Sequence, residues 1–247
     1  MPRFVPFRLV AACALALVLV LSIAASAAAK GPVADLRVIG KGGKTLAEGS
    51  YGAATATIEA SPQAKCFGPG TGGSGKEVTV KGPTALGMLI LAAQSTGALK
   101  PLLVTDAFDF GLGLCGIGGS VASSKASWYL KVNHENPELG GEMVKVKAGD
   151  EVLWALAPFP YPDELALSAP DDAKAGEPFT VRVFSYDDKG KKKPTAGAKV
   201  TGATGPTGKD GRTTVVLSKP ANLIARHGKD IPSNREAVCF GGRCPRG

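Results

Sequence analysis

The chain has 247 residues, enough for one or two domains, and a formal net charge of +8. Its 33 glycines and 18 prolines, set against few aromatic residues, favour many short strands joined by turns over long helices. The positive charge is suited to anionic cell-surface polymers or lipids, but basic and aromatic residues are not interleaved as in nucleic-acid-binding segments. We therefore expect no nucleic-acid partner.

The N-terminus has the pattern of an export signal. Arg3 and Arg8 precede an uncharged segment, Leu9 to Ala29, and Ala27-Ala28-Ala29 fits the small-residue cleavage pattern. We expect a signal peptide over residues 1–29, a secreted or cell-envelope protein, and no membrane span after cleavage. A retained single-span anchor is the alternative, because the apolar run approaches the length needed to cross a bilayer.

The first part of the exported chain predicts one helix among strands. Leu86, Leu89, Ile90 and Ala93 recur at i, i+3, i+4 and i+7, which predicts a helix over residues 84–95 with one apolar stripe. Thr84 is suited to cap its start, and Gly97 to end it. Strands are expected at residues 35–40, 51–60, 77–81 and 102–108, with glycine-rich loops at 68–75 and 111–119.

Both tryptophans lie in two later strands that are predicted to share a core. In Trp128–Asn133 and Lys147–Trp154, apolar residues recur at every second position, which is typical of a half-buried strand. Trp128, Leu130 and Val132 then point one way. We expect both indole rings to pack against the predicted helix.

A proline-rich segment divides the chain. Prolines alternate over residues 157–162, which resists both helix and interior strand and predicts a stiff linker over 158–163. Period-two runs beyond it, at residues 179–184 and 213–217, with further strands at 223–226 and 236–240, predict a small antiparallel β-sandwich over 164–240. Residues 241–247 would form a tail.

The four cysteines beyond the signal predict two disulfides. An even number of cysteines in an exported chain is typical of disulfide bonding. Cys239 and Cys244 are separated by four residues that include two glycines, so a local bridge is favoured, which leaves Cys66 with Cys115. Other pairings stay open, as does zinc binding by His227 with Cys239 and Cys244.

Several motifs resemble known sites but lack the surroundings that such sites need. Gly70 to Lys76 nearly matches a phosphate-binding loop and Gly111 to Gly116 a dinucleotide pattern, but no helix is expected after either. His134-Glu135 reads as an exposed turn without a neighbouring nucleophile. We therefore predict no catalytic residue, cofactor or metal. The lysines of residues 189–193 read as a solvated hairpin tip, with contact to an anionic polymer as the alternative.

The candidate ligand contacts come from two places. If Trp128 faces the core, then Tyr129, Lys131 and Asn133 share the opposite, exposed face of the strand. A tyrosine, a lysine and an asparagine in a row can stack on and hydrogen-bond a small ligand. The glycine-rich loop beside this face would add Phe110, Gly111 and Gly113, because glycines allow close approach of the backbone.

Residues 33–157 resemble the transcobalamin-like C-terminal domain family of bacterial exported domains. The matching segments, in order, are Gly82-Pro83-Thr84-Ala85-Leu86, the glycine-rich loop, Trp128–Asn133 and Gly149–Trp154. The resemblance implies a β-grasp-like fold, a mixed sheet curled around one helix. In the vitamin B12 carriers, a similar domain covers one face of the corrinoid, beside a large helical domain that this chain lacks.

One departure and one further resemblance bear on that interpretation. Cys66 and its glycine loop are inserted before the helix, which is expected to reshape the ligand edge. Residues 164–240 resemble an immunoglobulin-like or carboxypeptidase-regulatory-like sandwich, mainly in texture and in Lys209-Asp210-Gly211-Arg212.

The sequence thus predicts a mainly β protein with one helix, a β-grasp-like (α+β) domain followed by a small antiparallel β-sandwich. As function it favours an exported non-catalytic protein that binds a small ligand, a corrinoid among the candidates, or a cell-surface polymer or protein. The alternatives are a purely structural cell-envelope protein and, less favoured, a hydrolase that uses His134.

Overall fold

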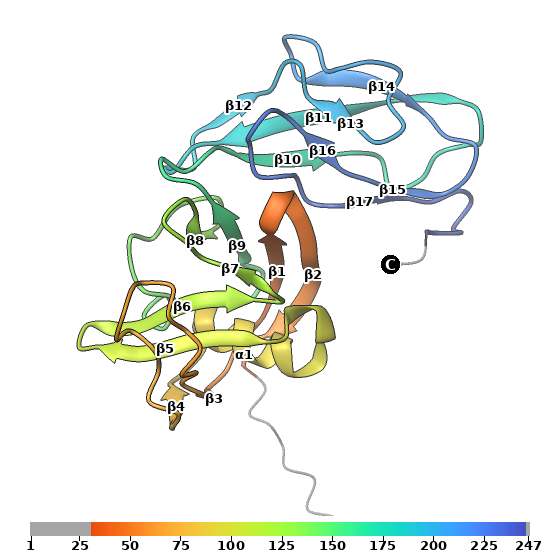
Figure 1. Ribbon diagram of the computed structural model, residues 1–247. Coiled ribbons are helices and arrows are strands. Elements are labelled where there is room, and N and C mark those ends of the chain that lie inside the picture. Colours follow the sequence, from red (N-terminus) through yellow and green to blue (C-terminus); the bar gives the residue numbers. More distant parts are fainter. Residues whose placement is uncertain (1–30, 246–247) are drawn as a thin grey trace, which may run out of the picture.

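The computed structural model describes residues 31–245 and is mainly β with one α-helix (Figure 1). The predicted signal peptide, residues 1–29, lies outside the described residues. Among the residues described, no helix combines the length and the apolar character needed to cross a membrane.

A four-stranded mixed sheet organises the N-terminal part, residues 31–157. Its order is β2 (Lys44–Gly52), β1 (Val33–Gly40), β9 (Glu151–Ala157) and β8 (Ser127–Val132). β1 runs parallel to β9, whereas the two outer pairs are antiparallel. β2 begins at Lys44, earlier than the strand expected at residues 51–60, and a short 3-10 turn (Lys41–Gly43) joins it to β1.

The helix α1 (Ala85–Ser95) forms where the apolar spacing predicts it. The Thr84 hydroxyl accepts a hydrogen bond from the Gly87 backbone N–H at 3.1 Å, which caps the first turn. The helix ends at Ser95 and is capped by Thr96, whereas Gly97, the expected end, begins a 3-10 turn (Gly97–Leu99). All four residues of the predicted stripe are buried, but so are Met88 and Ala92.

Burial on nearly every side of α1 follows from a second layer. A hairpin of β3 (Ala56–Glu59) and β4 (Glu77–Val80) and a sheet of β5 (Leu102–Phe108), β6 (Gly111–Ile117) and β7 (Ser120–Val121) add Val80, Val104 and Ile117 to the core around the helix. The helix therefore lies between the four-stranded sheet and this second layer, and not on the surface of the protein.

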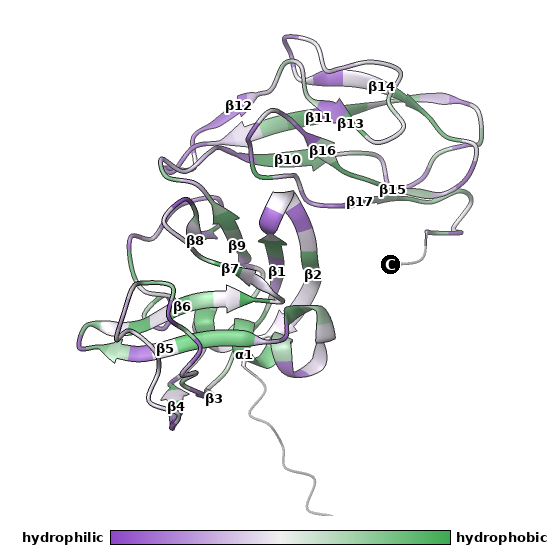
Figure 2. Ribbon diagram, viewed as in Figure 1, coloured by the Kyte–Doolittle hydropathy of each residue, from purple (hydrophilic) through white to green (hydrophobic). Residues whose placement is uncertain are grey.

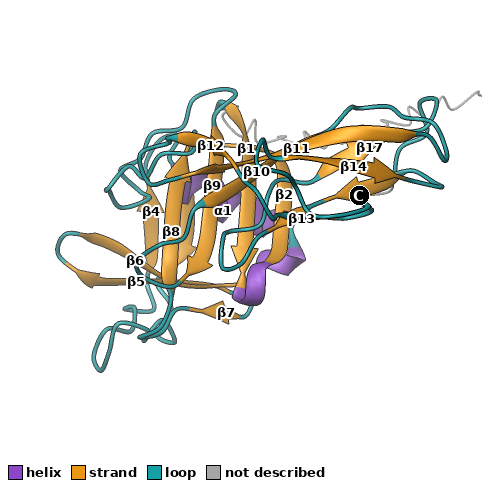
Figure 3. Ribbon diagram, turned by 90° about the horizontal axis from the view of Figure 1, so that it is seen from above, coloured by secondary structure: helices purple, strands orange, loops and turns teal. Residues whose placement is uncertain are grey.

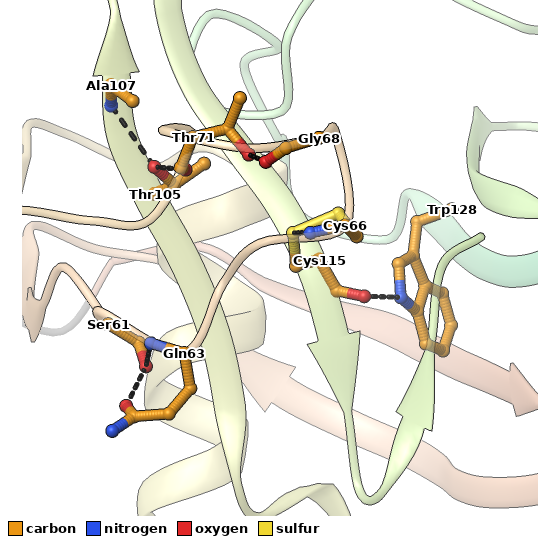
Figure 4. Close-up of a disulfide and its surroundings, with 9 residues drawn as sticks. All are labelled: Ser61, Gln63, Cys66, Gly68, Thr71, Thr105, Ala107, Cys115 and Trp128. Atoms are coloured by element: carbon orange, nitrogen blue, oxygen red, sulfur yellow. Dashed lines mark hydrogen bonds between the residues drawn. A yellow bond between two sulfur atoms is a disulfide. The ribbon is translucent and has the colours of Figure 1, made fainter. Parts of the chain in front are cut away.

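Both indole rings lie on the core side of the sheet, as predicted. Trp154 is buried within the helix core, and Trp128 packs against that core. The Trp128 indole N–H donates a hydrogen bond to the Cys115 carbonyl at 3.2 Å (Figure 4). The central packing prediction is confirmed.

The two predicted disulfides, Cys66–Cys115 and Cys239–Cys244, are both present, with Cα–Cα distances of 5.5 and 4.2 Å. Cys66 ties the loop that follows β3 to strand β6 (Figure 4). The Thr105 hydroxyl secures the same loop by donating to the Thr71 carbonyl at 2.6 Å. Because Cys239 and Cys244 are joined to each other, they are not available as zinc thiolates.

The loop expected over residues 111–119 is wrong, because most of it is strand β6. β6 pairs with β5 along its length, and only Gly118 and Gly119 form a turn. A Cβ at Gly113 would lie 2.7 Å from the Phe67 ring and 3.0 Å from the Phe108 ring. Gly113 therefore leaves room within the strand for the neighbouring aromatic rings. The glycine content of this segment, taken alone, predicts a loop.

The C-terminal part, residues 164–245, is built from strands around one core. β11 (Pro178–Tyr186) pairs with β10 (Glu164–Ser168), β12 (Lys192–Pro194) and β14 (Arg212–Val216). β13 (Lys199–Val200) pairs with β16 (Ala225–Arg226), and β15 (Ala221–Leu223) with β17 (Glu236–Val238). Sequence reasoning missed β10, β12 and β13.

The two parts are joined by a third, smaller core. It contains Ile39, Tyr129, Leu153, Ala155 and Ile231, and Tyr161 packs against it. The C-terminal strands project over the N-terminal sheet when seen from above (Figure 3), and β9 and β10, one on each side of the junction, are largely hydrophobic (Figure 2). β9 is therefore buried on both faces, and the expectation of a half-buried strand is wrong.

The disulfides predict a graded loss of stability. Replacing Cys66 and Cys115 by serine opens a loop of 49 residues, which in the chain-entropy model lowers the free energy of unfolding by about 4 kcal/mol. The same change at Cys239 and Cys244 opens a loop of 5 residues and should cost about 2 kcal/mol. Denaturant unfolding of the two double variants measures the difference, and equal losses would contradict this account.

Candidate functional site

The strand face proposed to contact a ligand is covered by the C-terminal part. Tyr129 is 2% exposed and Lys131 is 1% exposed, so the expectation that both reach solvent is wrong. The physical reason is that β8 and β9 carry a second apolar face that the C-terminal part buries. Asn133 is exposed, at the turn after β8.

The Lys131 side chain extends across the junction, where three oxygen atoms of the C-terminal part lie around its ammonium group. Its ammonium donates to the carbonyl oxygens of Tyr186 at 3.2 Å and Asp187 at 2.8 Å, and lies 3.4 Å from a carboxylate oxygen of Glu164. Burial lowers the pKa of Lys131, while the Glu164 charge acts in the opposite direction. Three acceptors match the three donors of an ammonium group.

Glu164 is a buried carboxylate that contacts three basic side chains of the N-terminal part. Arg37 pairs with its Oε1 atom, while Lys131 and His134 face Oε2, with the His134 Nδ1 atom at 3.1 Å. Burial acts to raise the pKa of Glu164, but the His134 hydrogen bond and the Arg37 charge outweigh it and hold the pKa below its usual value. The carboxylate is therefore ionised.

The remaining contacts also join the two parts across this junction. Arg37 also donates to the Pro232 carbonyl at 3.0 Å. The Tyr129 hydroxyl donates to Asp188, and the Tyr129 ring stacks on Tyr161 with centroids 4.0 Å apart. Burial, with the hydrogen bond to Asp188, raises the pKa of Tyr129. Tyr129 and Lys131, which were predicted to contact a ligand, instead contact the C-terminal part of the chain.

His134 lies in the predicted turn but is not exposed as expected. Asn133 and His134 have φ of 51° and 70°, and Val132 and Glu135 exchange backbone hydrogen bonds across them. Two left-handed residues in a two-residue turn are typical of a type I′ hairpin. The His134 ring stacks on Tyr186 with centroids 3.7 Å apart and contacts Glu164, so it belongs to the junction.

The other candidate residues lie elsewhere. Phe110 is 81% exposed at the tip of the β5–β6 hairpin, which points away from the C-terminal part (Figure 1). Its ring stacks on Phe108, and Gly111 and Gly113 begin β6 beside it. The structure does not bring this group together with Tyr129 and Lys131.

A cleft of about 450 Å³ lies beside the charged junction. β1 and β9 line one side, and β10, β11 and residues near β17 line the other, so both parts contribute. A concave site between two packed units is a common place for a small ligand.

Carboxylates dominate the charge of this cleft. Its ionisable lining comprises Asp35, Glu48, Glu151, Glu164 and Glu236, two cationic side chains, Arg37 and Lys192, and His134. Burial, together with the charges of Asp171, Glu48 and Glu151, raises the pKa of Glu236. One oxygen of Glu48 is buried with no hydrogen-bond partner, and the nearest cationic nitrogen, on Arg235, is 4.0 Å away.

An aromatic surface completes the cleft on its C-terminal side. The Lys192 ammonium lies 4.0 Å from the centroid of the Phe184 ring, and Arg182 lies 4.5 Å from the same centroid. Tyr186 lies beside Phe184 in the lining. The aromatic rings here already accept two cations of the protein itself.

Sequence reasoning missed Arg37, Glu164 and the cleft. Two signals were present. Arg37 lies between the apolar residues Leu36 and Val38 of its strand, and the four consecutive apolar residues from Val152 to Ala155 are typical of a strand buried on both faces. Within residues 31–245, no group of three or more His, Cys, Asp or Glu side chains is arranged to hold a metal ion.

Glu164→Gln is predicted to destabilise the protein and to remove one acid-sensitive step. Loss of the carboxylate leaves Arg37 and Lys131 buried without their counter-ion, which should cost about 3–5 kcal/mol. Because the pKa of Glu164 is lowered on folding, its contribution is present above the ordinary glutamate value of 4.5 and is lost as the pH falls through the folded value. Denaturant unfolding at pH 3 to 7 measures both effects.

Glu77→Gln is the matched control, because Glu77 is exposed on β4. Its stability should stay within about 0.5 kcal/mol of the unchanged protein. Equal effects of the two substitutions would contradict the role of Glu164.

Comparisons with known proteins give no relative. No model of a known protein family matches the chain, and no curated protein and no solved structure matches it. The resemblance to the transcobalamin-like C-terminal domain family therefore receives no support from these comparisons, and the β-grasp and immunoglobulin-like assignments stay predictions.

Proposed function

We propose that this chain is an exported, non-catalytic binding protein, and that its small-ligand site is the cleft between the two parts rather than the buried face of β8. The observation that carries the proposal is the cleft itself, a 450 Å³ hollow with carboxylates on several strands and an aromatic surface on one side. Two disulfides are compatible with an extracellular protein.

The lining favours a ligand that combines a positive charge with an apolar portion. Carboxylates outnumber cationic side chains in the cleft, although the whole chain is positively charged. Burial, with the charges of Asp171, Glu48 and Glu151, raises the pKa of Glu236, and one buried oxygen of Glu48 accepts no hydrogen bond and lies 4.0 Å from the Arg235 side chain. An amine would donate hydrogen bonds to these carboxylates, and the Phe184 and Tyr186 side chains of the lining would contact its apolar portion.

Binding is favoured over catalysis by the position of His134. A hydrolase using this histidine would need one ring nitrogen to face a nucleophile. Instead, both nitrogens face carboxylates, with Nδ1 3.1 Å from Glu164 and Nε2 3.5 Å from Glu151. These contacts hold the imidazole ring in the junction.

Thermal-shift measurements with spermidine, benzylamine and a lysine-containing tripeptide test the proposal, with haem, a corrinoid and neutral glycans as comparison ligands. A saturating amine at 100 times its Kd adds about 2.7 kcal/mol of stability, which should raise the Tm by about 5–10 °C. Glu236→Gln and Phe184→Ala should each weaken binding about tenfold or more.

Phe110→Ala is the matched aromatic control, because Phe110 lies at the exposed hairpin tip. It should leave binding unchanged. Loss of binding in Phe110→Ala alone would move the site to the hairpin. No response to any ligand, together with retention of the protein on purified cell wall, would favour the alternative of a purely structural cell-envelope protein.

A further inference from the structure

A second pocket, of about 320 Å³, lies at the opposite end of the junction from the cleft. Strands β1 and β9 reach both sites. Asp35 and Glu151, near the start of these strands, line the cleft, whereas Ile39 and Ala157, near their ends, line the second pocket. Ligand pockets usually have volumes of roughly 300–1,000 Å³, so the second pocket has room for a small molecule.

Much of the lining of the second pocket is apolar. Ile39, Ala155 and Ile231 line it, and all three are buried members of the small core that joins the two parts. Pro162 and Pro232 add further apolar surface. Such a lining is suited to the apolar body of a ligand.

The charged side chains of the second pocket are mainly basic. Arg226, His227 and Lys229 line it, and Asp230 is the single acidic residue among the described residues of the lining. The Asp230 Oδ2 atom lies 2.9 Å from the His227 Nδ1 atom, so this carboxylate already has a partner. The second pocket is therefore opposite in charge to the cleft, in which carboxylates outnumber cationic side chains.

Arg226 and Lys229 have hydrogen-bond donors that the protein does not use. The Arg226 guanidinium donates from Nη1 to the Gly43 carbonyl at 3.1 Å, and a guanidinium has five N–H groups in all. Lys229 forms no ion pair within residues 31–245. Both side chains are exposed. An anion in the second pocket would therefore find free donors on two cationic side chains.

A tight turn holds Lys229 beside the pocket. The Asp230 backbone N–H donates to the His227 carbonyl at 2.9 Å, and Gly228 between them has a φ of 49°. The contact between the Asp230 and His227 side chains closes the same turn. The position of the Lys229 backbone is thus fixed before any ligand binds.

A second turn, from the N-terminal part, borders the other side of the pocket. A Cβ atom at Gly42 would have no atom within 4 Å, so the space beside this residue is open. A Cβ atom at Gly43 would lie 3.0 Å from Arg226 Nη1 and 3.0 Å from the Pro232 ring. Arg226 therefore lies directly against this turn and joins the two sides of the pocket.

We propose that the second pocket binds a small organic carboxylate. The planar guanidinium of Arg226 offers donors in the geometry that a carboxylate accepts, and the Lys229 ammonium adds a second positive charge. The apolar lining favours a carboxylate with an aromatic or aliphatic body over an inorganic anion, which has no apolar surface to bury. The site is separate from the cleft, so it does not depend on the proposed amine ligand.

Three probes that share one aromatic ring test this site: benzoate, benzyl alcohol and benzylamine. Each is added to the full chain at up to about 20 mM, which detects Kd values in the millimolar range, and backbone amide NMR is recorded. Benzoate should shift the resonances of Gly42, Gly43 and Gly228 in a saturable way. Benzyl alcohol should bind about tenfold more weakly, because it lacks the charge, and benzylamine should leave these three resonances unchanged.

Two variants and one control make the test specific. Lys229→Gln and Arg226→Gln should each weaken benzoate binding about three- to tenfold. Lys229→Gln is the sharper variant, because Arg226 also holds the Gly43 turn. Lys209→Gln is the matched control, since Lys209 is exposed and lines neither site. It should bind benzoate as the unsubstituted protein does.

The absence of saturable shifts with benzoate would overturn the proposal. Equal binding of benzoate to Lys229→Gln and to the unsubstituted protein would overturn it too, as would equal binding of benzoate and benzyl alcohol. A failure of benzylamine to bind in the cleft would count against the proposed function and not against this site, so the two failures are distinguishable.

Discussion

The arrangement of the two parts depends on one buried carboxylate. Glu164 is 2% exposed, and burying an ion without partners would cost several kcal/mol. Its partners Arg37, Lys131 and His134 all come from the N-terminal part, so the charge is satisfied only when the parts are docked. Docking also buries Arg37 and Lys131, so these two cations need the Glu164 carboxylate in the docked state. The charges themselves thus specify how the two β-rich parts face each other.

The cleft is a product of that docking rather than a feature of either part. β1 and β9 bury one face against the helix α1 and the other against the C-terminal part. Their ends reach beyond the small apolar contact around Ile39 and Leu153, and there the two surfaces diverge and expose carboxylates. The apolar contact and the Glu164 ion pairs fix the distance between the walls. The shape of the site is therefore coupled to the integrity of the junction.

Local patterns predicted what local forces determine. The spacing of Leu86, Leu89 and Ile90 predicted the helix, and cysteine spacing predicted both disulfides. The junction could not be predicted in this way, because Arg37 and Glu164 are 127 residues apart and each resembles an ordinary surface charge. The prediction that Tyr129 and Lys131 reach solvent was wrong for the same reason. No residue near them in the sequence indicates which element covers them. The cleft could not be predicted either, because the strands that line it are far apart in the sequence.

The parallel pairing of β1 with β9 has a consequence for how the protein comes to be folded. Asp35 lies beside Glu151 in the sheet, and a chain that emerges from the ribosome N-terminus first delivers these residues at very different times. Until β9 emerges, the edge of β1 that will pair with it has no neighbouring strand. An unpaired strand edge is prone to pair with the wrong strand. Completion of the central sheet therefore requires that more than half of the chain has emerged. Once formed, the Cys66–Cys115 disulfide would hold the intervening helix α1 in place before β9 becomes available.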